Sequence, residues 1–113
     1  IGDPVNYTKA VRSLKWTNGI VESVSDEEIL EAKAHVDAAG IGAEPASCAT
    51  VAGIKKLMAR GEIKSNETVV GLLTGNILKD PQCIVDYHFE KKSLHANPPH
   101  DIEATIDDVK RFL

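Results

Sequence analysis

The stretch from Thr68 to Leu73 limits the possible folds more than any other part of the chain. It reads TVVGLL and is apolar apart from its first residue. A strand with no polar side is usually covered on both faces, as it is in a parallel sheet. The stretch ends at Thr74-Gly75, and open α/β folds bind their ligands at the carboxyl ends of such strands. We therefore expect a buried strand whose end faces a ligand.

Helical and strand-like patterns alternate along the rest of the chain. Tyr7, Val11 and Leu14 recur at helical spacing, whereas short β-branched or alternating segments are typical of strands. The sequence predicts helices over residues 5–15, 26–39, 46–60 and 106–113, and strands over residues 20–24, 41–43, 68–73 and 83–90. This order indicates an α/β fold, with a partly parallel sheet flanked by helices. The 113 residues are enough for one domain.

Local start and stop signals support the predicted helices. Ser25 and Glu28 match a capping box, in which the side chain of each accepts a hydrogen bond from the backbone N–H of the other. Thr105 begins the last helix by the same logic. Gly61 ends a helix, because glycine easily takes a left-handed conformation. We expect residues 91–100, which carry two prolines, to form a loop.

Composition narrows the range of partners. The net charge is −4 and the chain has no basic run, so nucleic acid and an anionic membrane are not expected partners. No apolar run approaches the ~20 residues needed to span a bilayer. We expect Cys48 and Cys83 to be reduced, which favours a cytoplasmic location, and Cys48 to serve packing. The Cys-to-His spacings match no zinc pattern, so we expect no metal, and we expect the histidines on a solvated surface.

Two segments could carry chemistry. Thr74-Gly75 and Glu44-Pro45 both follow predicted strands. In a parallel sheet both strand ends lie at one edge, so a hydroxyl, a carboxylate and glycine-exposed backbone could face one crevice. The alternative is that Thr74-Gly75 only ends a strand. Lys79 is a candidate for a lysine that forms a Schiff base, a role that requires a dry pocket. However, Lys79-Asp80-Pro81 is typical of a polar turn, and we expect the lysine to point outward.

Four segments carry a resemblance to a known family. They read IGDPVNYTKAV, VSDEEILEA, GIGAEPASCATVAGIKKL and VVGLLTGNILKDP, in that order. In this respect the chain resembles the C-terminal part of the threonine synthases, which are fold-type II enzymes dependent on pyridoxal 5′-phosphate (PLP). The similarity covers nearly the whole chain and becomes weaker after Pro81. It implies that residues 1–113 are a single C-terminal fragment of the large PLP-binding domain.

The resemblance also implies roles for four residues. The Thr74 hydroxyl would donate a hydrogen bond to the pyridine nitrogen of the cofactor, and Gly75 would let the backbone pass close to the ring. Glu44 resembles a carboxylate near the same edge of the ring, with a structural cap on the next helix as its alternative role. Gly2 would lie on a turn that borders the ring. The chain departs from the family where His-Gly often follows Thr-Gly, because it has Asn76-Ile77 there.

The activity implied by the resemblance is that of a PLP-dependent lyase. It would convert O-phospho-L-homoserine and water into L-threonine and phosphate, in a homo-oligomer. The Schiff-base lysine and the loop for the cofactor phosphate belong to upstream segments in this family. The resemblance therefore implies no catalytic residue in this chain and no activity of the chain alone. Two alternatives remain open, namely a threonine or serine dehydratase of the same fold and an autonomous, non-catalytic α/β binding module.

Overall fold

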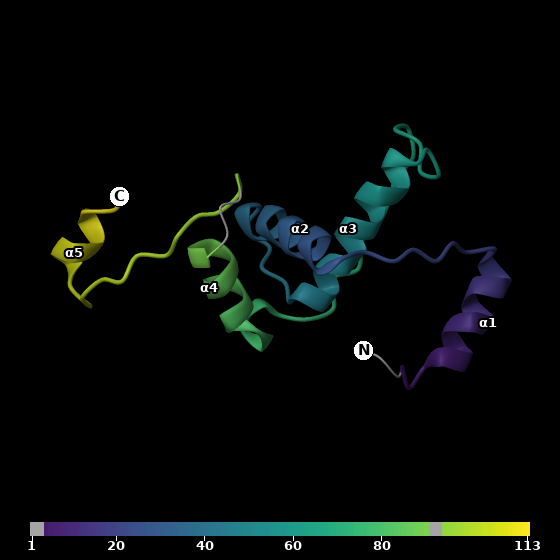
Figure 1. Cartoon of the computed structure of the whole chain (residues 1–113), viewed down its shortest axis with the longest axis horizontal. Helices are drawn as coiled ribbons and strands as arrows, with labels where there is room; N and C mark the ends of the chain where they lie inside the picture. The colour runs from purple at the N-terminus through teal and green to yellow at the C-terminus, as the bar shows by residue number, and fades with distance from the viewer. Residues whose placement is uncertain (1–3, 91–93) are drawn as a thin grey trace.

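The computed structural model describes residues 4–90 and 94–113, so the predicted site residue Gly2 lies outside the described residues. The described elements are α1 (Tyr7–Thr17), α2 (Asp26–Ala38), α3 (Pro45–Ala59), the short 3₁₀ helix η1 (Ile77–Lys79), α4 (Pro81–Glu90) and α5 (Ile106–Lys110). They form an elongated molecule of 57 × 34 × 23 Å. Helices α1 and α5 lie at opposite ends, with α2, α3 and α4 between them (Figure 1).

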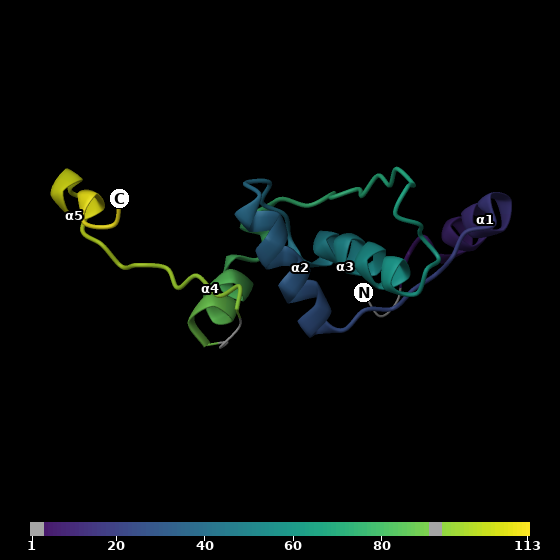
Figure 2. The same ribbon diagram turned by 90° about the horizontal axis from the view of Figure 1, so that it is seen from above.

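The core lies where α2 packs on α3, a pairing that can also be followed from above (Figure 2). Val36, Ala43 and Cys48 are its buried residues. Ile29, Val51 and Leu73 pack against them. Cys48 is fully buried, so its expected packing role is confirmed. Burial also raises the pKa of the Cys48 thiol, which keeps it protonated and unreactive at neutral pH.

The helix signals read from the sequence are confirmed. Ser25 Oγ accepts a hydrogen bond from the Glu28 backbone N–H at 3.3 Å, and Glu28 Oε2 accepts one from the Ser25 N–H at 2.7 Å. Thr105 caps α5 with one such bond, because its hydroxyl oxygen accepts a hydrogen bond from the Asp108 N–H at 3.3 Å. Gly61 has a positive φ of 76° after α3. These contacts are local in sequence, which is why they could be predicted.

Ser25→Ala is expected to lower the free energy of unfolding by about 0.5–2 kcal/mol, because the Glu28 backbone N–H would lose the Ser25 hydroxyl that accepts its hydrogen bond. Urea titration of the protein measures this change. Ser23→Ala, just upstream of the cap, is the matched control. A loss of activity in Ser25→Ala without a loss of stability would contradict a purely structural role.

The predicted sheet is not formed by the described residues. Residues 20–24 and 68–73 have no regular structure there, and residue 43 makes only an isolated antiparallel bridge, Ala43 to Asn76. A strand needs a neighbour to satisfy its backbone groups, and no described segment lies alongside these stretches as a pairing partner. Val70 and Leu72 are accordingly 80% and 73% exposed, instead of buried as predicted.

The predicted strand over residues 83–90 is wrong, because these residues form α4. Asp80 and Pro81 are the signal that outweighs the alternating pattern. Asp80 Oδ1 accepts a hydrogen bond from the Cys83 N–H at 3.1 Å, and Pro81 is the first residue of the helix, where proline is favoured. Tyr87, part of the supposed alternation, is buried on the helix. Residues 91–93 of the predicted loop lie outside the described residues.

Among the described residues, no helix has both the length and the apolar composition that crossing a membrane requires.

Candidate functional site

The end of the 68–73 stretch meets the start of α3. Glu44, the residue before α3, donates its backbone N–H to the Gly75 carbonyl at 3.1 Å. The neighbouring bridge from Ala43 to Asn76 holds the same two segments together. The structure thus brings Glu44 and Thr74-Gly75 together, although they meet through a bridge and not at the edge of a parallel sheet.

Ser47 lies where the start of α3 contacts Thr74-Gly75. It lies in the first turn of α3 and is 4% exposed. Its hydroxyl oxygen accepts hydrogen bonds from the backbone N–H groups of Thr74 (3.1 Å) and Gly75 (2.9 Å). The same oxygen lies 3.3 Å from Glu44 Oε1 and 3.4 Å from Thr74 Oγ1. Sequence reasoning did not single out Ser47, and its position three residues after Glu44 was the available signal.

Lys79 does not point away from the site as expected. Its Nζ atom lies 3.2 Å from Glu44 Oε2. The Lys79 side chain is 62% exposed and that of Glu44 is 17% exposed, so solvent weakens the attraction and the pair adds little to stability. The ion pair places the positive charge of Lys79 beside the Glu44 carboxylate. Glu44 occupies the N-cap position of α3, but its side chain makes no capping hydrogen bond there.

Gly75 is buried under the Glu44 side chain. A Cβ atom at position 75 would lie 1.9 Å from Glu44 Oε1, closer than any real contact. The absence of a side chain at Gly75 therefore makes room for the carboxylate. Thr74 is exposed beside this buried glycine. The cluster of Glu44, Ser47, Thr74, Gly75 and Lys79 thus combines a hydrogen-bonded base with one exposed residue that carries a hydroxyl, Thr74.

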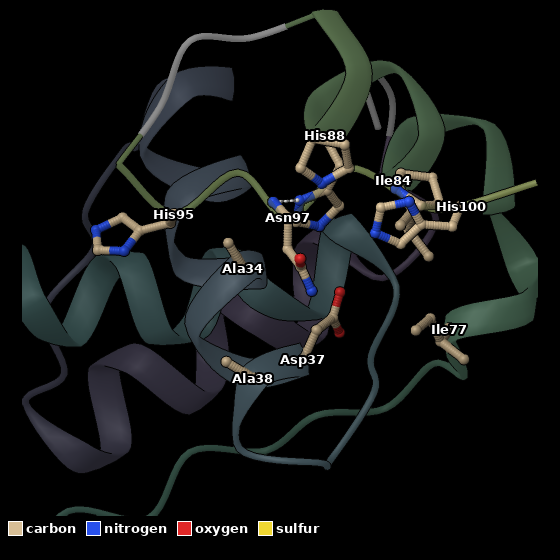
Figure 3. A pocket seen from close by; sticks show the side chains of 11 residues that line it. Ala34, Asp37, Ala38, Ile77, Ile84, His88, His95, Asn97 and His100 are labelled. Carbon is tan, nitrogen blue, oxygen red and sulfur yellow. Dashed lines mark hydrogen bonds between the residues drawn. The ribbon is translucent and has the colours of Figure 1, made fainter. Parts of the chain in front are cut away.

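A second hollow contains three of the histidines. It is a pocket of about 420 Å³ between α2, α4 and the segment that carries His95 and His100. His88 Nδ1 accepts a hydrogen bond from the Asn97 N–H at 2.9 Å, and the Asn97 side chain reaches toward Asp37 (Figure 3). His88 is therefore half-buried and bonded, not on a solvated face as predicted. Within residues 4–90 and 94–113, no group of His, Cys, Asp and Glu has the arrangement of a metal site.

Comparisons with known proteins point to one kind of enzyme. A family model described as pyridoxal-phosphate dependent enzyme matches residues 1–75. The chain is 49% identical to a threonine synthase of Methanosarcina acetivorans over 100% of its own length and 26% of that protein. It is 43% identical to a threonine synthase of Halalkalibacterium halodurans, over 97% of the chain and 30% of that protein. Threonine synthase 2, chloroplastic, of Arabidopsis thaliana is 36% identical over 100% of the chain and 23% of that protein. The chain thus spans less than a third of the length of these relatives.

Proposed function

The chain belongs to the pyridoxal-phosphate dependent enzyme family, and from this premise we propose that it forms the C-terminal part of a threonine synthase. The observation that carries the proposal is the identity of 36–49% to threonine synthases along essentially the whole chain. The complete enzyme would convert O-phospho-L-homoserine and water into L-threonine and phosphate. The free thiols Cys48 and Cys83 fit the cytoplasm, which is part of the proposal.

The residues present fit the pyridine end of the cofactor. PLP, when bound, supplies an electron sink for the substrate. Thr74 offers an exposed hydroxyl, while its backbone N–H is tied to buried Ser47. A hydroxyl is a neutral donor, so it suits a pyridine nitrogen that carries no proton, whereas a carboxylate would favour the protonated form. The role of Glu44 in the proposal is to support this hydroxyl from the base of the cluster, with Lys79 balancing its charge.

The exposed apolar stretches support a larger assembly. We include in the proposal that residues 20–24 and 68–73 become strands when they pair with the rest of a longer polypeptide. Val70 and Leu72 are exposed here, and covering such apolar side chains stabilises the assembled state. The proposal also includes a homo-oligomer, which sedimentation of the full-length enzyme would test.

The activity itself is tested with the full-length enzyme. Release of phosphate from O-phospho-L-homoserine and formation of L-threonine, both dependent on added PLP, are expected. Conversion of L-threonine or L-serine to a 2-oxo acid, with no phosphate release, would favour the dehydratase alternative. No binding of PLP would leave the non-catalytic module as the better description.

Thr74→Val is expected to lower cofactor affinity and turnover together. The change nearly keeps the shape of the side chain but leaves the ring nitrogen without its donor, at a cost of about 1–3 kcal/mol if that nitrogen is buried. Titration of the apoenzyme with PLP and a phosphate-release assay measure the two effects. Thr68→Val, the same substitution at the other end of the stretch, is the matched control. Unchanged affinity and turnover in Thr74→Val would remove Thr74 from the site.

A further inference from the structure

The Ser47 hydroxyl has more polar neighbours than it has hydrogen-bonding capacity. A serine hydroxyl offers one proton and two acceptor lone pairs. The N–H groups of Thr74 and Gly75, at 3.1 and 2.9 Å, take both lone pairs. The single proton is then shared between two possible acceptors, Glu44 Oε1 at 3.3 Å and Thr74 Oγ1 at 3.4 Å.

Charge decides where the Ser47 proton goes. Hydrogen bonds to a carboxylate are roughly twice as strong as bonds between neutral groups. Glu44 Oε1 is also the nearer of the two acceptors. The Ser47 proton is therefore donated to Glu44. The Thr74 hydroxyl cannot donate to the Ser47 oxygen, because both lone pairs of that oxygen are already in use, so its own proton is available to a ligand.

We propose that Ser47 is a positioning residue that fixes the Thr74-Gly75 turn and leaves the Thr74 hydroxyl as a donor to the cofactor's ring nitrogen. This inference rests on the proposed function, because it needs a hydrogen-bond acceptor in front of Thr74. Ser47 itself touches no ligand in this arrangement. It acts through the two backbone N–H groups and through its bond to Glu44, all of which are contacts within the described chain.

The experiment is a double-mutant cycle in the full-length enzyme, read as PLP affinity of the apoenzyme and as the absorbance spectrum of the bound cofactor. Ser47→Ala leaves two N–H groups without their acceptor, and we expect PLP affinity to fall roughly tenfold. If Ser47 acts through Thr74, the combined Ser47→Ala/Thr74→Val variant should lose little more affinity than Thr74→Val alone. The cofactor spectrum should shift in the same sense in both single variants.

Two further variants keep the test decisive. Thr50→Val is the matched control, because Thr50 Oγ1 donates from α3 to the Leu72 carbonyl at 3.4 Å, a bond to the same stretch that does not involve the Thr74 and Gly75 N–H groups. It should leave PLP affinity unchanged. If Ser47→Ala does not fold, Ser47→Cys nearly keeps the volume with a weaker donor and acceptor, and several-fold weaker PLP binding is expected.

The outcomes separate this inference from the proposed function. A wild-type enzyme that binds no PLP would reject the proposed function. Wild-type binding that weakens in Thr74→Val but is unchanged in Ser47→Ala or Ser47→Cys would reject only the role of Ser47. Fully additive losses in the double variant would also reject it, because the two residues would then act independently.

Discussion

Lys33→Met is expected to lower the free energy of unfolding by about 3 kcal/mol, the low end of the usual cost of removing one partner of a buried ion pair, because the Asp37 side chain is 18% exposed. The Lys33 side chain is 4% exposed, and its Nζ atom donates to Asp37 Oδ2 and to the Ala43 carbonyl, both at 2.8 Å. Methionine would fill the space but leave the carboxylate unpaired and the carbonyl with only a weak bond from the Cys48 thiol at 4.0 Å. The other oxygen of Asp37, Oδ1, is buried and already lacks a hydrogen bond within the described residues. Urea titration of the full-length enzyme measures the loss.

Two further variants show whether the loss comes from the unpaired charge. Lys33→Met/Asp37→Leu should recover much of the stability, because replacing both partners by apolar residues is often nearly neutral. Lys55→Met is the matched control, since Lys55 is 70% exposed and lies 3.8 Å from Glu31. It should change stability by less than about 1 kcal/mol. A Lys33→Met variant as stable as the wild type would show that the pair is not buried in the enzyme.

Lys33 also connects the core with the candidate site. The Ala43 carbonyl that it binds belongs to the residue before Glu44, and Ala43 itself pairs with Asn76. Loss of Lys33 therefore releases the segment that carries Glu44. We expect PLP affinity to fall in Lys33→Met as a consequence of this release, even though Lys33 makes no contact with Thr74-Gly75.

The sequence predicted those parts of the structure that depend on neighbours along the chain. The capping box at Ser25 and the helix end at Gly61 each involve residues within one turn, so composition and spacing were sufficient. The predicted strand at residues 83–90 is wrong, because the helix start at Asp80-Pro81 outweighs the alternating pattern that follows it. The strands at 20–24 and 68–73 need partners distant in sequence, and the described residues offer none.

The candidate site was predicted only in part for the same reason. Glu44 and Thr74-Gly75 were expected at one edge, and they do meet. Ser47 and Lys33 were missed, because a buried serine or lysine reads as an ordinary polar residue until its partners are known. Ser47 binds residues 27 and 28 positions away. Such contacts follow from tertiary packing, which no local pattern encodes.

Gly75→Ala is expected to displace the Glu44 side chain and so to disturb the candidate site. The added Cβ would lie 1.9 Å from Oε1, 2.0 Å from Cδ and 2.6 Å from Cγ of Glu44, so the whole end of that side chain must move. Moving it breaks the contacts of Glu44 with Ser47 and Lys79. Because the obstructing atoms are the end of a flexible side chain, the cost in stability lies at the low end of the about 1–3 kcal/mol that overpacking usually causes. PLP affinity should fall as well, because Ser47, which binds the Thr74 and Gly75 N–H groups, would lose the carboxylate that accepts its proton.

Two controls accompany Gly75→Ala: the same substitution at a position without a clash, and a double variant in which the clash is removed. Gly53→Ala in α3 adds a Cβ with no heavy atom within 4 Å, and it should stabilise the helix by about 0.5–1 kcal/mol. Gly75→Ala/Glu44→Ala removes the obstructing carboxylate, so stability should return while PLP affinity stays low. If the double variant recovered affinity as well, Glu44 would have no part in presenting Thr74. Gly75→Ala could also bind PLP as tightly as the wild type. That result would show that the Glu44 carboxylate does not occupy the space beside Gly75 in the enzyme, and that Glu44 is not the acceptor of the Ser47 proton.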